Sequence, residues 1–464
     1  MSNTLIVTNP FTGKTLDTLA LDNAACVEHA LDQADRIFRD KRCWLPLHQR
    51  VSILESLAKL VRQQKDALAL QVSQECGKPL NDAQREVERA IDGIHLAVET
   101  IRNEAGTVVP MGGTSASTHR IAFTQMEPVG PVVAVSAFNH PFNLIVHQVI
   151  PAVATGCPVI VKPALETPLS CRSLVALLHQ AGLPKLWCQM VLPESTSLAE
   201  TLVTDTRVGF FSFIGSSRIG WMLRAKLAPG TRCALEHGGV APLIIAKDGD
   251  IEQAAAAVTK GGFYHAGQVC VSVQRVYVHN SVIEVFCQRL VTKTSALNTG
   301  DPSNTDTDVG PLIRPNEIQR IHSWVTEAAS SGQVLCGGKE LPNNCYAPTI
   351  VLNPSNDAKL SQQEVFGPVV CVYGYDNLSS AIEIANAVPV AFQASIFTQN
   401  LETALSVYRG INASAVMLND HTAFRIDAMP FAGLKQSGLG VGGIPHTIAD
   451  MQTEKMMVIH SPEL

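Results

Sequence analysis

Apolar side chains recur at three- and four-residue intervals through the first part of the chain. In RVSILESLAKLVRQQKDALALQVSQ, the residues Val51, Leu54, Leu57 and Val61 fall on one face of a helix. The Gly and Pro of CGKP interrupt this pattern, and a second amphipathic run follows in VERAIDGIHLAVETI. The pattern therefore predicts helices over residues 47–104 with a break at CGKP.

The pattern changes after residue 129, where short apolar runs alternate with longer helical ones. The short runs are typical of buried strands: VVAVSAF, VIVKPA and VGFFSFIG. The runs between them have helical periodicity: LIVHQVIPAVATG and LSCRSLVALLHQAG. This alternation predicts βαβ units and a parallel sheet with helices on both faces.

A second alternating series begins near residue 240. Its strand candidates are PLIIA, RVYVH, VVCVYGY and ASIFT, and its first helices are expected around IEQAAAAVTKGGFYHAG and VIEVFCQRLVTKTSAL. Two consecutive series predict an α/β fold class with two α/β units and an active site between them.

Two further segments fit neither series. Residues 117–127, STHRIAFTQME, and the C-terminal KMMVIH each resemble an isolated strand. We expect these strands to pair with each other or to extend the sheet of a neighbouring subunit.

Composition indicates a folded protein without a nucleic-acid footprint. The chain has 464 residues, of which 46% are hydrophobic and 16% charged, and its net charge is -6. Nucleic acid is therefore disfavoured as a partner. The longest apolar runs are far shorter than the ~20 residues of a membrane span, so we expect no membrane association. The N-terminal MSNTLIVTNPFTG does not resemble an export signal, which favours a cytoplasmic location.

The twelve cysteines contain no C-x-x-C pair, so no zinc or dithiol motif is indicated and no metal is expected. Scattered thiols are typical of proteins in a reducing cytoplasm. The default interpretation of each cysteine is a small buried side chain. A reactive cysteine has to be argued from its surroundings.

Three short stretches carry residues that can do chemistry together. Asn139 lies in AFNHPFN, Glu236 precedes a Gly-Gly pair in ALEHGG, and Cys270 ends HAGQVC. Each has an ordinary explanation as a helix cap, a surface charge or a core thiol. Together they offer a nucleophile, a base and an oxyanion donor.

FSFIGSSRIG is a candidate nucleotide-binding turn. A strand is expected to end at Gly215-Ser216 and a helix to begin there, which directs backbone N–H groups toward an anion. The turn lacks the P-loop lysine and the G-x-G-x-x-G spacing, so a plain strand-to-helix turn explains it equally well.

Ten ordered stretches resemble the NAD(P)-dependent aldehyde dehydrogenase superfamily. They are TNPFTGK, ECGKP with REV, AFNHP, VIVKPA, FIGSSRIG, LEHGG, GQVC, GDPSNTDTDVGPLI, EVFGPV and PFAGLKQSGLG. FNHPFN, GQVC and FRIDAMPFAGLKQSG are most similar to the lactaldehyde and phosphonoacetaldehyde dehydrogenase branch.

The resemblance implies an aldehyde dehydrogenase-like fold with two Rossmann-like domains and a small β flap that mediates oligomerisation. Residues 1–115 and 131–237 would form the cofactor-binding domain, and residues 238–445 the catalytic domain. Residues 116–130 and 446–464 would form the flap. A homodimer or homotetramer is implied.

The resemblance also assigns roles within the site. Cys270 would be the nucleophile that forms a thiohemiacetal and then a thioester, Asn139 the oxyanion donor, and Glu236 the base that activates the hydrolytic water. The implied cofactor-binding residues are Ser136, Phe138, Lys162, Gly215, Ser216, Glu364 and Phe366.

The cofactor motif departs from the pattern of NAD-preferring relatives, which often carry Glu three residues after the lysine. Here that position is Leu165, and Glu166 follows one step later. Either NAD or NADP is therefore expected, with a slight preference for NAD.

The substrate side also departs from relatives that oxidise apolar aldehydes. His140, His147 and Arg425 occur where a polar tunnel wall is implied, which predicts a small polar aldehyde, anionic or neutral. Packing as an ordinary core or surface side chain is the better explanation of each histidine taken alone. Arg425 is equally explained by an ion pair with the nearby Asp427.

Three alternatives remain open at the level of sequence. A CoA-acylating dehydrogenase would transfer the acyl group to CoA, although such enzymes commonly lack the base that Glu236 offers. A cysteine hydrolase would use Cys270 with His265. A non-catalytic member of the family would use neither residue.

Overall fold

The computed structural model describes residues 3–464. The predicted helices over 47–104 are confirmed, and the chain turns between α3 and α4 because Gly77 takes a φ of 74° as the C-cap of α3. The N-terminal helices are α1 (Ala24–Arg39), α2 (Leu47–Gln63), α3 (Lys65–Cys76) and α4 (Leu80–Arg102).

The first alternating series forms a six-stranded sheet of order β21-β9-β8-β5-β6-β7. Five of its strands run parallel: β5 (Val132–Val135), β6 (Val159–Lys162), β7 (Cys188–Met190), β8 (Phe210–Ile214) and β9 (Arg232–Glu236). The helices of this series are α5 (Asn143–Thr155), α6 (Pro168–Gln180), α7 (Thr196–Thr204) and α8 (Ser217–Arg224). The strand order reverses between β5 and β8, which is where open α/β sheets bind ligands.

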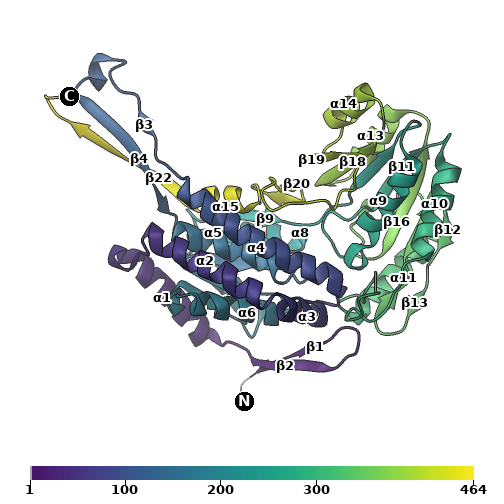
Figure 1. The fold of residues 1–464 in the computed structure, drawn as a ribbon, viewed down its shortest axis with the longest axis horizontal. Coiled ribbons are helices and arrows are strands. Elements are labelled where there is room, and N and C mark those ends of the chain that lie inside the picture. The colour runs from purple at the N-terminus through teal and green to yellow at the C-terminus, as the bar shows by residue number, and fades with distance from the viewer. Residues whose placement is uncertain (1–2) are drawn as a thin grey trace.

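The second series forms a seven-stranded sheet of order β12-β15-β16-β11-β10-β18-β19. Its strands are β10 (Pro242–Ile245), β11 (Arg275–His279), β12 (Gln333–Cys336), β15 (Thr349–Leu352), β16 (Val369–Tyr375), β18 (Gln393–Phe397) and β19 (Ala415–Leu418), with β12 antiparallel. Its helices are α9 (Ile251–Phe263), α10 (Ile283–Ser295), α11 (Pro315–Ala329), α13 (Leu378–Asn386) and α14 (Leu401–Gly410). The two predicted α/β units appear as the two lobes of Figure 1.

Each sheet lies between layers of apolar side chains. One core packs α2 to α6 against the first sheet, a second fills the other face of that sheet, and a third surrounds the seven-stranded sheet. The remaining short elements are β1 (Thr4–Thr8), β2 (Thr15–Ala20), β13 (Glu340–Leu341), β14 (Cys345–Tyr346), β17 (Val390–Ala391), β20 (Leu434–Lys435), α12 (Lys359–Gln362) and α15 (Ile444–Asp450). Within residues 3–464, no helix is both long enough and apolar enough to cross a membrane.

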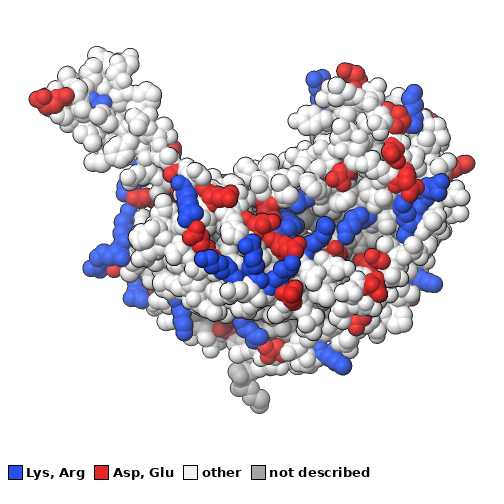
Figure 2. Space-filling model, in the orientation of Figure 1, with Lys and Arg blue, Asp and Glu red and all other residues white. Residues whose placement is uncertain are grey.

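The two strands that fit neither series pair with each other, which is the first of the two arrangements expected. β22 (Gln452–His460) runs antiparallel to β4 (Arg120–Pro128) along its whole length. The pair forms an arm that projects from the body and ends near the C-terminus (Figure 1). The outer part of the arm carries few charges on the face shown in Figure 2.

Two short strands belong to other sheets than the expected domain boundaries imply. β3 (Val108–Val109) pairs with β4 of the arm, and β21 (Gly438–Leu439) pairs antiparallel with β9 of the first sheet. A two-residue strand is too short to have a periodicity, so its partner depends on tertiary packing. We retain the three-part division as a proposal, with these two strands reassigned.

Candidate active site between the two sheets

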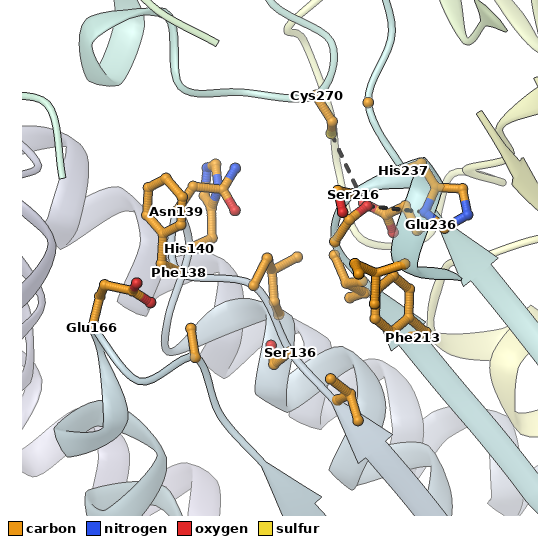
Figure 3. Close-up of a pocket in the computed structure, with 18 of the residues that line it drawn as sticks. Ser136, Phe138, Asn139, His140, Glu166, Phe213, Ser216, Glu236, His237 and Cys270 are labelled. Atoms are coloured by element: carbon orange, nitrogen blue, oxygen red, sulfur yellow. Dashed lines mark hydrogen bonds between the residues drawn. The ribbon is translucent and has the colours of Figure 1, made fainter. Parts of the chain in front are cut away.

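A cavity of about 700 Å³ lies at the carboxyl ends of the first sheet's strands. Its walls come from the loops after β5, β6, β8 and β9 and from residues of the second lobe, including Cys270 and Arg425. It contains the strand-order reversal between β5 and β8, so its place in the fold is that of a ligand site. Figure 3 shows part of this cavity.

Cys270 follows an unusual backbone segment. The 3-10 turn Tyr264–Gly267 contains two residues in the left-handed region, His265 with φ 49° and Ala266 with φ 54°. Such conformations are uncommon for residues other than glycine and are often found at functional sites. Cys270 itself is partly exposed to the cavity.

The thiol of Cys270 faces the carboxylate of Glu236 from the other lobe. Its Sγ donates to Glu236 Oε1 over 3.8 Å (Figure 3). Burial, and then the negative charge of Glu236, raise the pKa of the Cys270 thiol well above its ordinary value. Burial likewise raises the pKa of Glu236, although Arg425 opposes that shift. A thiol in contact with a carboxylate can act as a nucleophile beside an acid–base group.

Glu236 is the last residue of β9, and Gly215 contacts both Glu236 and the residue that follows it. Its carbonyl accepts from the Gly215 N–H at 3.0 Å, and the next residue, His237, has its Nδ1 2.9 Å from the Gly215 carbonyl. Gly238 leaves room for Glu364, because a Cβ at that position would overlap the Glu364 carboxylate. Gly238 therefore permits a close approach between the Glu364 carboxylate and the backbone that follows Glu236.

Asn139 lies in the loop after β5 and is buried. Its Nδ2 donates to the backbone carbonyl of Gln268 at 2.9 Å, two residues before Cys270. The Gln268 side chain in turn accepts from the Ile313 N–H at 3.0 Å. In Figure 3, Asn139 and Glu236 lie on different sides of Cys270. The structure thus brings together the three predicted catalytic residues from three segments of the chain.

The predicted cofactor residues all line the same cavity. Two of them have buried oxygens without a hydrogen-bond partner within residues 3–464, Ser136 Oγ and Glu364 Oε1. Burial raises the pKa of Glu364 to about 8. Buried polar atoms are nearly always paired, so these oxygens fit a ligand with hydroxyl or amide groups. The rings of Phe138 and Phe366 pack edge to face with centroids 5.7 Å apart.

The predicted strand-to-helix turn is present at Gly215 and Ser216. β8 ends at Ile214, and α8 begins at Ser217 with Ser216 as an N-cap whose side chain makes no capping hydrogen bond. The Ile219 N–H donates to the Ser216 carbonyl at 3.1 Å, so the N–H groups of Ser217 and Arg218 are those that remain available at the start of this eight-residue helix. This geometry suits the pyrophosphate of a dinucleotide, as the resemblance implied.

The far end of the cavity carries an ion pair that the sequence did not reveal. Glu166 Oε1 accepts from Arg314 Nε at 2.6 Å, which joins the loop after β6 to the residue before α11. Lys162 Nζ donates to the Pro163 carbonyl at 3.1 Å, and burial lowers the Lys162 pKa although Glu166 opposes it. The charge of Glu166 acts on the Lys162 ammonium, so Glu166 brings a carboxylate close to the predicted ribose site.

The alternative explanation of Arg425, an ion pair with Asp427, does not hold in the structure. Asp427 instead accepts from Arg89 Nη2 at 2.8 Å and contacts His147 Nε2 at 2.6 Å. Within residues 3–464, no carboxylate lies within ion-pair distance of Arg425. Its guanidinium stacks on the Phe431 ring, 3.6 Å from the centroid.

The two predicted substrate histidines differ in their surroundings. Burial lowers the pKa of both, that of His147 to about 4 although Asp427 opposes the shift. His147 is held by Asp427, whereas His140 Nε2 lies 3.2 Å from the Tyr264 hydroxyl. Both line the cavity as neutral rings.

Arg89 is a cavity residue that was not predicted. It lies on α4 at helical spacing from Asp82 and Glu86, both of which are buried. Charges at positions 82, 86 and 89 on the apolar face of an amphipathic helix were the available signal. Such a face has to meet a polar partner in the interior.

His265 offers no support for a Cys–His hydrolase. Its side chain is fully buried, and neither ring nitrogen has a hydrogen-bond partner among the described residues. The hydrogen bond of the Cys270 thiol goes to Glu236 instead. A general base has to reach the proton that it removes.

Known proteins resemble this chain along nearly its full length. The family model described as the aldehyde dehydrogenase family matches residues 1–457. The 3-sulfolactaldehyde dehydrogenase of Priestia aryabhattai is 36% identical over 413 residues, which cover 89% of this chain and 86% of the relative. The lactaldehyde dehydrogenase of Methanocaldococcus jannaschii is 33% identical over 458 residues, which cover 98% and 96%.

Solved structures agree with the fold. The glyceraldehyde-3-phosphate dehydrogenase of Methanocaldococcus jannaschii, complexed with NADP, superposes with a TM-score of 0.93 at 32% identity and covers 99% of this chain and 100% of that chain. The expected fold class is therefore confirmed. Because sequence and fold agree over almost the whole molecule, this chain belongs to the aldehyde dehydrogenase family.

Proposed function

We propose that this protein oxidises a small anionic aldehyde to the carboxylic acid with NAD or NADP, through a covalent intermediate on Cys270. The observation that carries the proposal is the approach of the Cys270 thiol to Glu236 inside a cavity that also holds Asn139. A thiol, a base and an amide donor are the groups that acyl transfer through a thioester requires.

The first step is attack of Cys270 on the aldehyde carbon. The thiol has to lose its proton, because only the thiolate is nucleophilic. We assign that proton to solvent in the cavity, which leaves the Glu236 carboxylate free for the second step. The carbonyl oxygen becomes an oxyanion, which the Asn139 amide and the Cys270 backbone N–H stabilise.

The cofactor supplies the hydride acceptor when it is bound. We assign Lys162 to the adenine ribose, Gly215 and Ser216 to the pyrophosphate and Glu364 to the nicotinamide ribose. The unpartnered Glu364 oxygen and the N–H groups of Ser217 and Arg218 at the start of α8 support this assignment. Ser136, Phe138 and Phe366 complete the wall around it.

The second step releases the acid. Loss of hydride from the thiohemiacetal leaves a thioester on Cys270, and Glu236 removes a proton from the water that attacks it. The raised pKa of Glu236 suits this role, because a base with a pKa closer to neutrality accepts a proton more readily.

We assign the substrate's negative charge to Arg425. This guanidinium lines the cavity without a carboxylate partner, and Arg89 nearby adds positive charge. Two of the similar proteins are named for anionic aldehydes, 3-sulfolactaldehyde and glyceraldehyde-3-phosphate. His140 is the second candidate donor, and His147 contributes less because Asp427 already holds it.

We propose a preference for NAD over NADP. Glu166 places a carboxylate near Lys162, where it would oppose a 2′-phosphate. Arg314 partly offsets this charge, so the preference should be slight.

We propose that the arm formed by β4 and β22 joins subunits in a homodimer or homotetramer. β22 is the edge strand of the three-stranded sheet, and Met456, Met457, Val458 and Ile459 are exposed on it. An exposed apolar edge strand favours pairing with another chain.

We also propose a cytoplasmic location. All twelve cysteines are free thiols, and Cys26 and Cys43 are exposed. Exposed free thiols persist most readily in a reducing compartment.

The proposal is tested by a panel of short aldehydes, charged and neutral, assayed for NADH and NADPH formation without CoA. We expect acid formation, with the highest kcat/KM for an anionic aldehyde. Turnover only after addition of CoA would instead assign acyl transfer to CoA, and no turnover across the panel would indicate a non-catalytic member of the family.

A further inference from the structure

Helix α5 begins without a cap from its own sequence. Its N-cap is Phe142, whose side chain cannot accept a hydrogen bond. The N–H groups of Phe142 and Asn143 instead donate to Glu86 Oε1, at 2.9 and 3.1 Å, from helix α4. A carboxylate at this end of a helix satisfies two unpaired donors and interacts favourably with the helix dipole.

The capping carboxylate belongs to a buried ion pair. Glu86 Oε2 accepts from Lys78 Nζ, and both side chains are fully buried. Burying two charges is costly, and well-packed apolar residues would often be at least as stable. The ion pair is therefore poorly explained by stability alone.

The ion pair lies behind the loop that carries the oxyanion donor. Asn139 and His140 precede α5 directly and both line the cavity. The His140 carbonyl accepts from the Leu144 N–H at 2.9 Å, so the loop and the first turn of α5 are hydrogen-bonded to each other. Fixing that turn also fixes the backbone from which the Asn139 amide extends.

We propose that Glu86, with its charge balanced by Lys78, is a positioning residue for Asn139. The carboxylate fixes the start of α5 so that the Asn139 amide is held beside the Cys270 segment, where it already donates to the Gln268 carbonyl. This inference rests on the proposed role of Asn139 as oxyanion donor. Misplacing such a donor by about 1 Å can cost on the order of 100-fold in rate.

The test replaces both charges by apolar side chains of similar length, in the double variant K78M/E86L. This change removes the cap without leaving a charge unpaired, so we expect the protein to fold, with a thermal stability below that of the wild type because the N–H groups of Phe142 and Asn143 lose their acceptor. The quantity measured is the single-turnover rate of NADH formation from succinic semialdehyde at saturating NAD. We expect it to fall about tenfold or more, with the Kd for NADH within about twofold of wild type.

A double-mutant cycle with N139A separates positioning from a general structural effect. If Glu86 acts through Asn139, removing the cap should cost less than about twofold once the amide is absent. E86Q, studied in the same cycle, serves if K78M/E86L does not fold. Additive losses in the two backgrounds would overturn the inference.

Glu75 provides a matched control. It is a second buried carboxylate from the same part of the chain, and it caps α6 through the N–H groups of Leu169 and Ser170, both at 2.8 Å. We expect E75L to leave the single-turnover rate at saturating NAD within about threefold of wild type. A normal rate in N139A would overturn the proposed oxyanion role, whereas a slow N139A with a normal K78M/E86L would overturn only the positioning role.

Discussion

Arg425 is a guanidinium without a carboxylate partner in the wall of the cavity. We predict that R425A raises KM for succinic semialdehyde about tenfold or more, because a hydrogen bond to a charged group contributes ~1.5–3 kcal/mol. KM for butanal, a neutral aldehyde of equal chain length, should change little. Steady-state kinetics on the two substrates measures the difference.

Arg425 also stacks on Phe431, so the competing explanation is that Arg425 stabilises the fold. A purely structural role would lower the melting temperature of R425A without changing either KM. Equal losses on both aldehydes would also assign Arg425 to structure rather than to recognition of a charge.

Glu166 is the residue through which cofactor preference should change. We predict that E166Q increases the ratio of NADPH to NADH affinity by about tenfold, because the substitution removes a negative charge near Lys162 and releases Arg314. Fluorescence titration with each reduced cofactor measures the two Kd values. An unchanged ratio would show that Glu166 does not face the 2′ position.

At the scale of residues, the sequence motifs predicted which residues share one cavity better than they predicted the contacts of those residues. Cys270, Glu236 and Asn139 were found because each lies in a recognisable motif, and the structure brings all three to one cavity. The alternative partner considered for Asp427 was Arg425, which is close in sequence, whereas its actual partner Arg89 is 338 residues away and reaches it through folding. Sequence proximity says little about long-range ion pairs.

The Glu75 carboxylate, which caps helix α6, should make the stability of the protein depend on pH. Burial raises the pKa of Glu75 from 4.5 to about 7, although hydrogen bonds from Ser170 and Leu169 oppose the shift. Between these values the unfolded chain releases a proton that the folded protein retains, so stability falls as pH rises from about 4.5 to 7. The loss should amount to about 3 kcal/mol for this one group.

The variant E75Q removes this titration. We predict that the melting temperature of E75Q minus that of the wild type increases as the pH is raised from 5 to 7.5. Differential scanning fluorimetry across that range measures the change. A constant difference between the two proteins would show that Glu75 does not titrate there.

At the scale of elements, periodicity predicted the helices and strands but not what holds their ends. Helices α5 and α6 have no side-chain cap of their own, and Glu86 and Glu75 of earlier segments supply it. No local pattern indicates a cap that comes from a residue 56 or 94 positions away. The two-residue strands β3 and β21 escaped prediction for the same reason.

At the scale of the whole molecule, the arm formed by β4 and β22 carries apolar side chains that are exposed in a single subunit. We predict that V458D on β22 lowers the molecular mass in light scattering to that of a smaller assembly, because a charge on an apolar contact strand disfavours association. I6D, an equivalent change on the exposed strand β1, is the control and should leave the mass unchanged. An unchanged mass for V458D would exclude the arm as the main contact.

The covalent role of Cys270 is the central claim, and the thioester itself tests it most directly. E236Q should still form NADH in one turnover with succinic semialdehyde, since losing the Glu236 charge favours the thiolate, but its thioester should hydrolyse slowly. After an acid quench and trypsin digestion, mass spectrometry should find the succinyl group on GGFYHAGQVCVSVQR, a peptide with Cys270 as its single cysteine. NADH formation without an acyl group on this peptide, or with one on another cysteine, would contradict the account.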